Sequence, residues 1–358
     1  MRIAIIGNGG IAHTHVKELK SLGENVAVVI GRNQERTKDF AKCYGIGTYT
    51  EDFEAALAPG IDCVHICTPP ALHYEMVKRV LEAGKHVVCE KPLCIKAEQA
   101  KELADLAHEK QVVAAIDFNV RYYDACRQMK EMMDKQELGK LCLIHGSYLQ
   151  EFHALPESYS WRYQEQLGGK MRAVTEIGSH YIDLVRFVTG MEIVEVSADF
   201  GNFTPNRYVK DGIMYEEKLD GAKEILVHSE DVAILSFRLS NGVLGNVVLS
   251  EVSHGRSNYL NIEMTGTKQS VWWNSEDCNR LNTSQKGNGI CSGMNAFGGG
   301  FEDTVGRLFA DVYVTIKSGE VAHSYPDFTD GYINLAICEA IYESNSKNGI
   351  WTKVCVEA

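Results

Sequence analysis

Short apolar runs and amphipathic segments alternate along the first third of the chain. The apolar runs predict buried strands at residues 3–6, 25–32, 61–70, 85–93 and 111–122, with a shorter strand near Thr48. The segments between them have the spacing of helices, most clearly at residues 71–84 and 97–110. Strands that alternate with helices form a parallel sheet covered on both faces. We therefore predict an α/β domain with a doubly wound parallel sheet over residues 1–119.

The pattern changes from about Gly139 onward, where longer strand-like segments follow one another. They lie at residues 140–150, 193–201, 224–240, 242–253 and 258–273. Turn signals at 240–242 and 265–267 separate them. Residues 120–358 are therefore predicted to form an α+β domain with a large, open, mostly antiparallel sheet. We expect the polar stretch 202–223 to be an insertion or long loop, the glycine-rich stretch 282–300 to be a flexible surface segment, and a last helix, 333–342, to return to the N-terminal domain.

Charge and composition exclude several classes of partner. The 358 residues carry a net charge of −12, which disfavours binding to nucleic acid or an anionic membrane. No apolar run approaches the length of a membrane span, and the N-terminus has no apolar core of a signal peptide. The eleven cysteines form no C-x-x-C pair, which favours reduced thiols in the cytoplasm and no metal site.

A glycine motif stands between the first strand and the first helix. It reads Gly7-x-Gly9-x-x-Ala12. In that context Gly7 permits a tight turn, Gly9 and the neighbouring Gly10 and Ile11 let a pyrophosphate approach, and the small Ala12 permits helix–strand packing. The N-terminus of the helix then attracts the phosphates. A glycine-rich turn without a ligand is the alternative, but the strand–helix context favours a dinucleotide site.

The end of the second strand bears on the choice of dinucleotide. A site for NAD usually has an acidic residue there, which binds the ribose 2′-hydroxyl. This chain has Gly31 and Arg32, with Arg36 one turn further on. A missing acid and an available guanidinium suit the 2′-phosphate of NADP, although Arg32 stacking on adenine is an open alternative. We expect NADP or NAD, with NADP slightly favoured.

Polar residues follow several of the predicted parallel strands. Thr68, Glu90, Lys91 and Asn119 all stand at strand ends. Ligands of open α/β sheets bind beyond the carboxyl ends of the strands, so these residues are predicted to line the cofactor site. Pro92 restricts the backbone of Lys91 and helps to direct its side chain.

One helix of the second half carries unusual polar residues. In residues 173–190, Glu176, His180 and Asp183 are spaced to share one helical face beside an apolar stripe. A solvated surface is the plain alternative. The apolar surroundings and the preceding glycine pair 168–169, which would let another element come close, favour a functional cluster.

These elements together resemble the Gfo/Idh/MocA family of oxidoreductases, named after glucose–fructose oxidoreductase and inositol dehydrogenase. The resemblance spans nearly the whole chain. It rests on the glycine motif with His15 and on "TPPALH", "AGKHVVCEKP", "SWR" and "EIGSHYIDL". It implies a Rossmann domain followed by a domain whose open sheet packs against another subunit, giving a homodimer or homotetramer.

The resemblance also implies roles for single residues. Lys91 matches the lysine that touches nicotinamide and the substrate hydroxyl, and His180 matches the catalytic histidine. Glu176 stands where many members have aspartate, and Asp183 matches an acid that anchors substrate or orients the histidine. Further cofactor contacts are implied for Pro69, His73, Trp161 and Arg162. Packing is the leading role for His15, as it is for His73.

The implied chemistry is oxidation of a secondary alcohol by NAD(P). His180 can accept the hydroxyl proton, and the Lys91 ammonium can stabilise the developing alkoxide. Tyr148, Gln150, His153 and Tyr163 are candidate contacts for a sugar, cyclitol or glycoside, with ordinary packing as the alternative. Two other functions stay open: a redox-assisted glycosidase or lyase with a recycled cofactor, and a dinucleotide-binding sensor without turnover.

Overall fold

The structure is a computed structural model, and it describes residues 1–319 and 324–357. The chain forms two compact units. Unit 1 comprises Met1–Tyr122 and Gly300–Leu335, and unit 2 comprises Tyr123–Gly299 and Ala336–Ala358. Among the described residues, no helix combines the length and the apolar character needed to cross a membrane.

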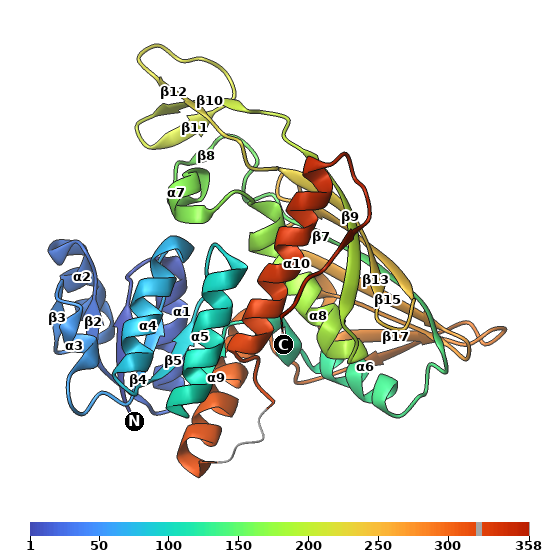
Figure 1. Cartoon of the computed structure of the whole chain (residues 1–358), viewed down its shortest axis with the longest axis horizontal. Helices are drawn as coiled ribbons and strands as arrows, with labels where there is room; N and C mark the ends of the chain where they lie inside the picture. Colours follow the sequence, from blue (N-terminus) through green and yellow to red (C-terminus); the bar gives the residue numbers. More distant parts are fainter. Residues whose placement is uncertain (320–323, 358) are drawn as a thin grey trace. The chain divides into compact units, whose positions relative to one another are not determined.

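Unit 1 contains a parallel sheet of six strands in the order β3-β2-β1-β4-β5-β6 (Figure 1). The strands are β1 (Arg2–Ile6), β2 (Asn25–Ile30), β3 (Tyr49–Thr50), β4 (Cys63–Ile66), β5 (His86–Cys89) and β6 (Ala114–Ile116). The helices are α1 (Gly10–Ser21), α2 (Gln34–Tyr44), α3 (Glu54–Leu57), α4 (His73–Glu82), α5 (Ala97–Lys110) and α9 (Phe301–Ser318). The predicted doubly wound sheet, including the short strand beside Thr48, is confirmed.

The hydrophobic core of unit 1 lies between the parallel sheet and the helices that cover it. Ile3, Ile5 and Val29 are fully buried because parallel strands are covered on both faces. Helix α9 adds Leu308 and Phe309 to the same core, although about 180 residues separate it from the rest of the unit. Helix α10 runs from Phe328 to Ser346, longer than the predicted 333–342, and its first residues up to Leu335 belong to unit 1.

Unit 2 contains a mostly antiparallel sheet of nine strands in the order β18-β17-β16-β15-β7-β14-β13-β9-β19. These strands are β7 (Leu141–Leu149), β9 (Ile193–Gly201), β13 (Val232–Leu239), β14 (Leu244–Ser250), β15 (Tyr259–Gly266), β16 (Ser270–Asn274), β17 (Arg280–Ser284), β18 (Ile290–Met294) and β19 (Thr352–Lys353). Only β7 and β14 pair in parallel. The predicted open sheet is confirmed.

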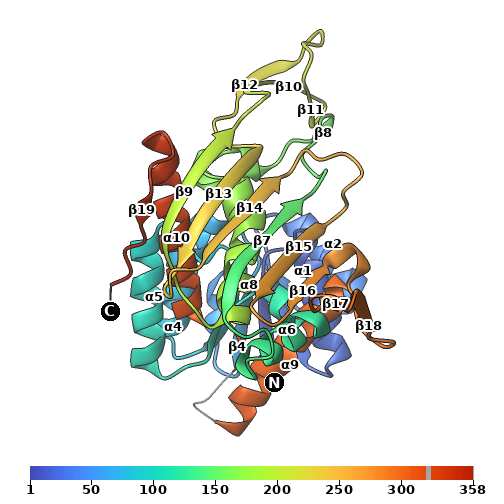
Figure 2. The same ribbon diagram turned by 90° about the vertical axis from the view of Figure 1, so that its right-hand side faces the viewer.

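The two faces of this sheet differ in their cover. Helices α6 (Asp124–Asp134) and α8 (Ser179–Thr189) lie on one face, and Figure 2 shows no helix of the described part of unit 2 on the other face. On that open face Leu143, Ile234, Leu244 and Val248 are 39–56% exposed. Ile234 is paired with Val248 and Leu244 with Leu143, so two apolar cross-strand pairs lie on this face, four residues apart along β14.

Two predicted loops are strands instead. The polar stretch 202–223 contributes β10 (Asn206–Lys210), β11 (Ile213–Tyr215) and the start of β12 (Lys223–Leu226), which form a small sheet with β8 (Glu157–Ser158). Asp211 and Gly212, both with positive φ, make the two-residue turn of a hairpin, a signal that the polar composition hid. The glycine-rich stretch 282–300 likewise forms the hairpin of β17 and β18.

Candidate functional site

The glycine motif has the geometry of a phosphate-binding turn. Gly7 has a φ of +110°, and a Cβ there would lie 2.5 Å from the carbonyl oxygen of Cys67, so no other residue fits. A Cβ on Gly9 or Gly10 would meet no protein atom within 4 Å, which leaves space above the turn. Helix α1 begins at Gly10 without a side-chain cap or an acidic residue in its first turn. Its N–H groups therefore suit an anionic ligand.

The residues that follow β2 are those predicted to bind the adenosine part of the dinucleotide. Gly31 is buried, and a Cβ there would lie 2.5 Å from Thr37 Oγ1 and 2.9 Å from the amide of Asn8. Arg32 and Arg36 are exposed. Two guanidinium groups, and no acidic residue directly after the strand, are therefore available at the position where a dinucleotide fold binds the ribose.

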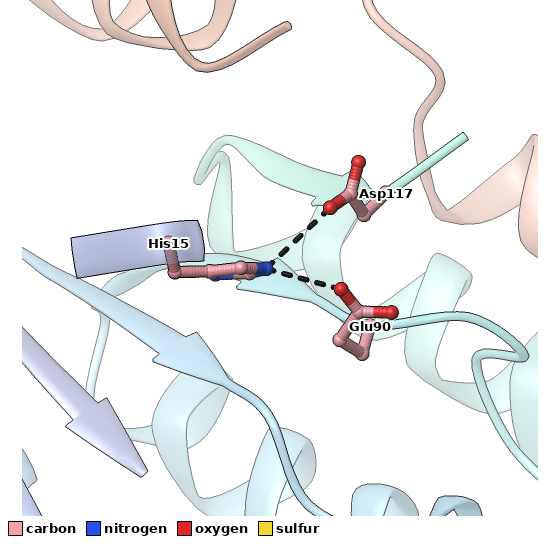
Figure 3. A group of neighbouring side chains, drawn as sticks. All are labelled: His15, Glu90 and Asp117. Carbon is pink, nitrogen blue, oxygen red and sulfur yellow. Dashed lines mark hydrogen bonds and ion pairs between the residues drawn. The ribbon is translucent and has the colours of Figure 1, made fainter. Parts of the chain in front are cut away.

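Buried polar residues meet at the carboxyl ends of β5 and β6 (Figure 3). The His15 ring from α1 lies with Nε2 at 3.1 Å from Glu90 Oε1 and 3.4 Å from Asp117 Oδ2. Its Nδ1 lies 2.9 Å from Nδ1 of His65 on β4. All four residues are less than 10% exposed. The sequence singled out Glu90 and His15, but it gave no signal that Asp117 and His65 would join them.

The charges in this group shift one another's titration. Burial alone opposes a charged His15, but Cys67 and the carboxylates of Asp117 and Glu90 raise its pKa well above the ordinary value. Burial raises the pKa of Asp117 to about 6, whereas hydrogen bonding to His15 outweighs burial at Glu90 and lowers its pKa. These shifts are consistent with a protonated His15 that faces the carboxylates of Glu90 and Asp117.

The Glu90–Lys91–Pro92 segment is held on both sides. Glu90 Oε2 accepts a hydrogen bond from the Lys91 backbone N–H at 3.2 Å. The buried His73 ring lies 3.0 Å from the Pro92 carbonyl and 2.7 Å from the Thr68 carbonyl, so it links two strand ends. This contact gives His73 a positioning role in the structure.

The remaining strand-end candidates have different surroundings. Asn119 donates a hydrogen bond to Thr304 Oγ1 at 2.8 Å and is buried, so its amide serves to hold α9. Pro69 stands as the N-cap of the short turn Pro70–Leu72.

The histidine helix of unit 2 begins with a π-helical turn, Val174–Gly178, and continues as α8. Gly178 packs closely on the sheet, since a Cβ there would lie 2.6 Å from Leu249 Cδ1. This contact buries the polar face of the helix: His180 is 5% exposed and Asp183 fully buried. The Tyr148 ring lies beside His180, with 6.5 Å between the ring centroids. Such burial contradicts the alternative of a solvated surface.

Glu176 lies between two cationic side chains. Arg162 Nε donates to Glu176 Oε2 at 2.8 Å, and His153 Nε2 lies 3.6 Å from the same oxygen. The Arg162 guanidinium also stacks on Trp161 at 4.7 Å. Of the predicted unit 2 residues, the structure therefore brings Trp161, Arg162, His153 and Glu176 into one continuous group.

His153 is enclosed by protein groups on both ring nitrogens. Its Nδ1 lies 3.0 Å from Glu157 Oε2 and 2.7 Å from the hydroxyl of Tyr163. Burial opposes its charge, but Glu251, Glu157 and Glu176 together raise its pKa to about 9. Tyr148 and Gln150 also have protein hydrogen-bond partners, because Tyr148 Oη and Gln150 Nε2 each donate to Asn258 Oδ1 at 2.7 Å.

A buried charged cluster lies behind His153 and was missed by the sequence reasoning. The Tyr163 ring is stacked between the guanidiniums of Arg172 and Arg207, each 4.9 Å from its centroid. Both arginines pair with Asp231, and Arg172 also binds Glu251 at 2.8 Å. Burial raises the pKa of Glu251 to about 7. The only sequence signal was the acidic residues at the ends of β13 and β14.

Within residues 1–319 and 324–357, two groups contain side chains of the types that bind metals. They are His15, Glu90 and Asp117, and His153, Glu176 and Glu251. In the first group His15 pairs with both carboxylates, and in the second Arg162 and Arg172 pair with Glu176 and Glu251. One oxygen of Asp117 and one of Glu251 are buried without a hydrogen-bond partner in the described part of the chain. The expected lack of a metal stays a prediction.

A parallel sheet with an open phosphate-binding turn, joined to a unit with a buried acid–histidine helix, defines a dinucleotide-binding oxidoreductase. Residues 1–118 match the model described as the oxidoreductase family with an NAD-binding Rossmann fold, and residues 126–272 match the GFO/IDH/MocA C-terminal domain. The chain belongs to the GFO/IDH/MocA oxidoreductase family.

Individual proteins are similar to this chain in sequence and in structure. Levoglucosan dehydrogenase of Pseudarthrobacter phenanthrenivorans is 29% identical over 91% of this chain and 89% of its own length. An uncharacterized oxidoreductase of Synechocystis is 30% identical over 77% of this chain and 72% of its own. A solved structure of levoglucosan dehydrogenase in complex with NADH and L-sorbose superimposes with a TM-score of 0.91 at 27% identity, covering 100% of this chain and 99% of the other.

Proposed function

We propose that this protein is an NAD(P)-dependent dehydrogenase that transfers a hydride between nicotinamide and a secondary hydroxyl of a sugar, cyclitol or glycoside. The observation that carries the proposal is the buried acid–histidine set on the helix of unit 2, where Asp183 is fully buried and His180 is 5% exposed. Burial of such costly polar groups is typical of sites with a chemical role. The likeness to a relative named levoglucosan dehydrogenase supports the same substrate class.

In the proposed reaction His180 accepts the proton of the substrate hydroxyl, as a histidine can near neutral pH. The ammonium of Lys91 donates a hydrogen bond to the oxygen while it gains alkoxide character. Glu176, held by Arg162 at 2.8 Å and by His153 at 3.6 Å, remains a carboxylate that can bind a neighbouring hydroxyl. Asp183 orients His180 or anchors the substrate. The bound nicotinamide supplies the hydride acceptor.

The substrate is expected to be uncharged. The arginines around Glu176 and His153 are committed to acidic partners: Arg162 to Glu176, Arg172 to Glu251 and Asp231, and Arg207 to Asp231. A phosphate group would have to compete with these pairs. Hydroxyl-rich neutral compounds should therefore be oxidised better than their phosphorylated forms.

The cofactor is NAD(H), as in the NADH complex of the relative, and Arg32 and Arg36 favour acceptance of NADP(H) as well. A second copy of the chain is the proposed cover for the open face of the nine-stranded sheet. The exposed Leu143, Ile234 and Leu244 are the apolar centre of that contact, which gives a homodimer or a homotetramer.

The reaction is tested by following nicotinamide absorbance with inositols, aldoses, glycosides and sugar phosphates. A dehydrogenase accumulates reduced cofactor one-for-one with oxidised product. His180→Ala and Lys91→Met should each lower kcat by roughly 10²–10⁴. Cleavage of a glycoside without net cofactor reduction would instead identify the redox-assisted hydrolase. Cofactor binding without turnover of any compound would identify a sensor and contradict the proposal.

A further inference from the structure

Buried side chains of unit 1 form a continuous line of contacts from helix α9 to the backbone of Lys91. Tyr313 Oη lies 2.6 Å from His65 Nε2, and His65 Nδ1 lies 2.9 Å from His15 Nδ1. His15 Nε2 then lies 3.1 Å from Glu90 Oε1 (Figure 3). Glu90 Oε2 accepts the Lys91 N–H at 3.2 Å. One carboxylate therefore joins the His15 ring to the backbone of Lys91.

The hydrogen-bond geometry limits where the protons of the two histidines lie. His15 Nε2 faces carboxylate oxygens, which only accept, so this nitrogen carries a proton. The contact between the two Nδ1 atoms holds one further proton, on either His15 or His65. In the first case His15 is an imidazolium and His65 donates from Nε2 to Tyr313. In the second case both rings are neutral and Tyr313 donates to His65.

The neighbouring charges select the first case. Glu90 and Asp117 both approach His15 Nε2, and their side chains are only 11% and 3% exposed. Burial, together with the resulting cation at His15, holds the pKa of His65 well below its ordinary value, so His65 stays neutral. One imidazolium then stands against two carboxylates. The charge of Lys91 also lowers the pKa of Glu90, so these two cations and two carboxylates sum to zero.

We propose that His15 is a positioning residue for Lys91. Its imidazolium fixes the Glu90 carboxylate, whose other oxygen fixes the Lys91 N–H, and it offsets the charge of the two carboxylates next to that lysine. Without this cation, Glu90 and Asp117 would attract the Lys91 ammonium and compete with the reacting oxygen. This inference rests on the proposed function, in which Lys91 acts on the substrate.

Five elements in the described part of unit 1 contribute to this network, with His15 on α1 at its centre. His65 faces His15 from β4 and Cys67 from just after β4, while Glu90 and Asp117 face it from the ends of β5 and β6. Tyr313 on α9 contacts His65. Phe309 closes the site edge-on to both histidine rings, each 4.8 Å away between centroids. Water has little room to screen these charges, so the removal of one charge changes the pKa values of the other groups.

Two substitutions separate charge from packing. His15→Gln keeps a side-chain N–H for Glu90 but carries no charge, and His15→Leu removes both. His13→Gln is the matched control on the same helix, because the partly exposed His13 bonds to Tyr44 and lies outside the network. Each variant is compared with the wild type and Lys91→Met in kcat, KM, NAD(H) affinity and pH dependence.

We expect both His15 variants to lower kcat by roughly 10–100-fold, the cost of displacing a reacting group by about 1 Å, with NAD(H) affinity little changed. The alkaline limb of kcat should move to higher pH, because the Lys91 ammonium loses a neighbouring cation. Reductive methylation of Lys91, followed by mass spectrometry of its peptide, should slow for the same reason. His13→Gln should match the wild type in all these measurements.

Results that contradict this inference can be distinguished from results that contradict the proposed function. An inactive Lys91→Met enzyme beside His15 variants with unchanged kcat, alkaline limb and methylation rate would overturn the positioning role alone. A fully active Lys91→Met enzyme would overturn the proposed function and this inference together. If His15→Leu does not fold, His15→Gln decides the outcome, and a kcat loss without a shifted alkaline limb would mean ordinary structural damage.

Discussion

Protonation of His153 should make the stability of unit 2 depend on alkaline pH. The pKa of this histidine is about 9 in the folded protein, since Glu251, Glu157 and Glu176 outweigh the effect of burial. In the unfolded chain it returns to about 6.5. Because the folded pKa is the higher one, the stabilisation is complete below about pH 6.5 and is lost as the pH rises through about 9.

The magnitude follows from these two pKa values. Protonation of His153 contributes about 2–3 kcal/mol to the free energy of unfolding at pH 7 and under about 1 kcal/mol at pH 9. The loss of about 2 kcal/mol corresponds to a fall in Tm of roughly 4–8 °C for a unit of this size. His153→Gln cannot titrate at this position. It should therefore be less stable than the wild type at pH 7, and its Tm should fall less between pH 7 and pH 9.

Tryptophan fluorescence is a selective assay for this effect. All four tryptophans belong to unit 2, namely Trp161, Trp272, Trp273 and Trp351. Thermal unfolding is therefore followed by fluorescence at several pH values from 7 to 9.5 for the wild type, His153→Gln and the exposed control His254→Gln. Equal declines in Tm for wild type and His153→Gln would refute the reasoning, and so would a control that behaves like His153→Gln.

Three further outcomes are expected. In calorimetric titrations Arg32→Ala should weaken NADP(H) more than NAD(H), and a wild-type preference for NAD(H) above tenfold, about 1.4 kcal/mol, would contradict the role of Arg32. Light scattering at micromolar concentration should give at least twice the single-chain mass of 39.8 kDa, and Ile234→Glu on the open face should lower it; a wild-type mass of one chain would exclude the proposed assembly. Gly7→Ala places a Cβ 2.5 Å from the Cys67 carbonyl and should weaken NAD(H) binding, measured by fluorescence quenching. Gly47→Ala, with open space around it, is its control, and equal affinities in the two variants would argue against the strain at Gly7.

Local patterns were sufficient for the parallel sheet of the first unit, but not for α9, which the sequence analysis left in the second domain. The alternation of strands and helices predicted the six-stranded parallel sheet, because apolar periodicity reports burial within a few residues. Gly7 could be recognised because its positive φ and its contact with Cys67 leave room for no side chain. The hairpin at Asp211 and Gly212 had an equally local signal, which the polar composition of its strands obscured.

What the sequence determined by itself was therefore the dinucleotide fold, the placement of Lys91 at a strand end, and the acid–histidine helix with His180. Only the tertiary structure decided which charges surround them. Asp117 meets His15, and Arg172 meets Glu251, across separations of 102 and 79 residues. Whether such a side chain is solvated or buried depends on elements distant in the chain, because strand ends and helices meet only when the sheets assemble. The charge and hydrogen-bond partners of these groups, unlike their helix or strand, are therefore properties of the folded protein.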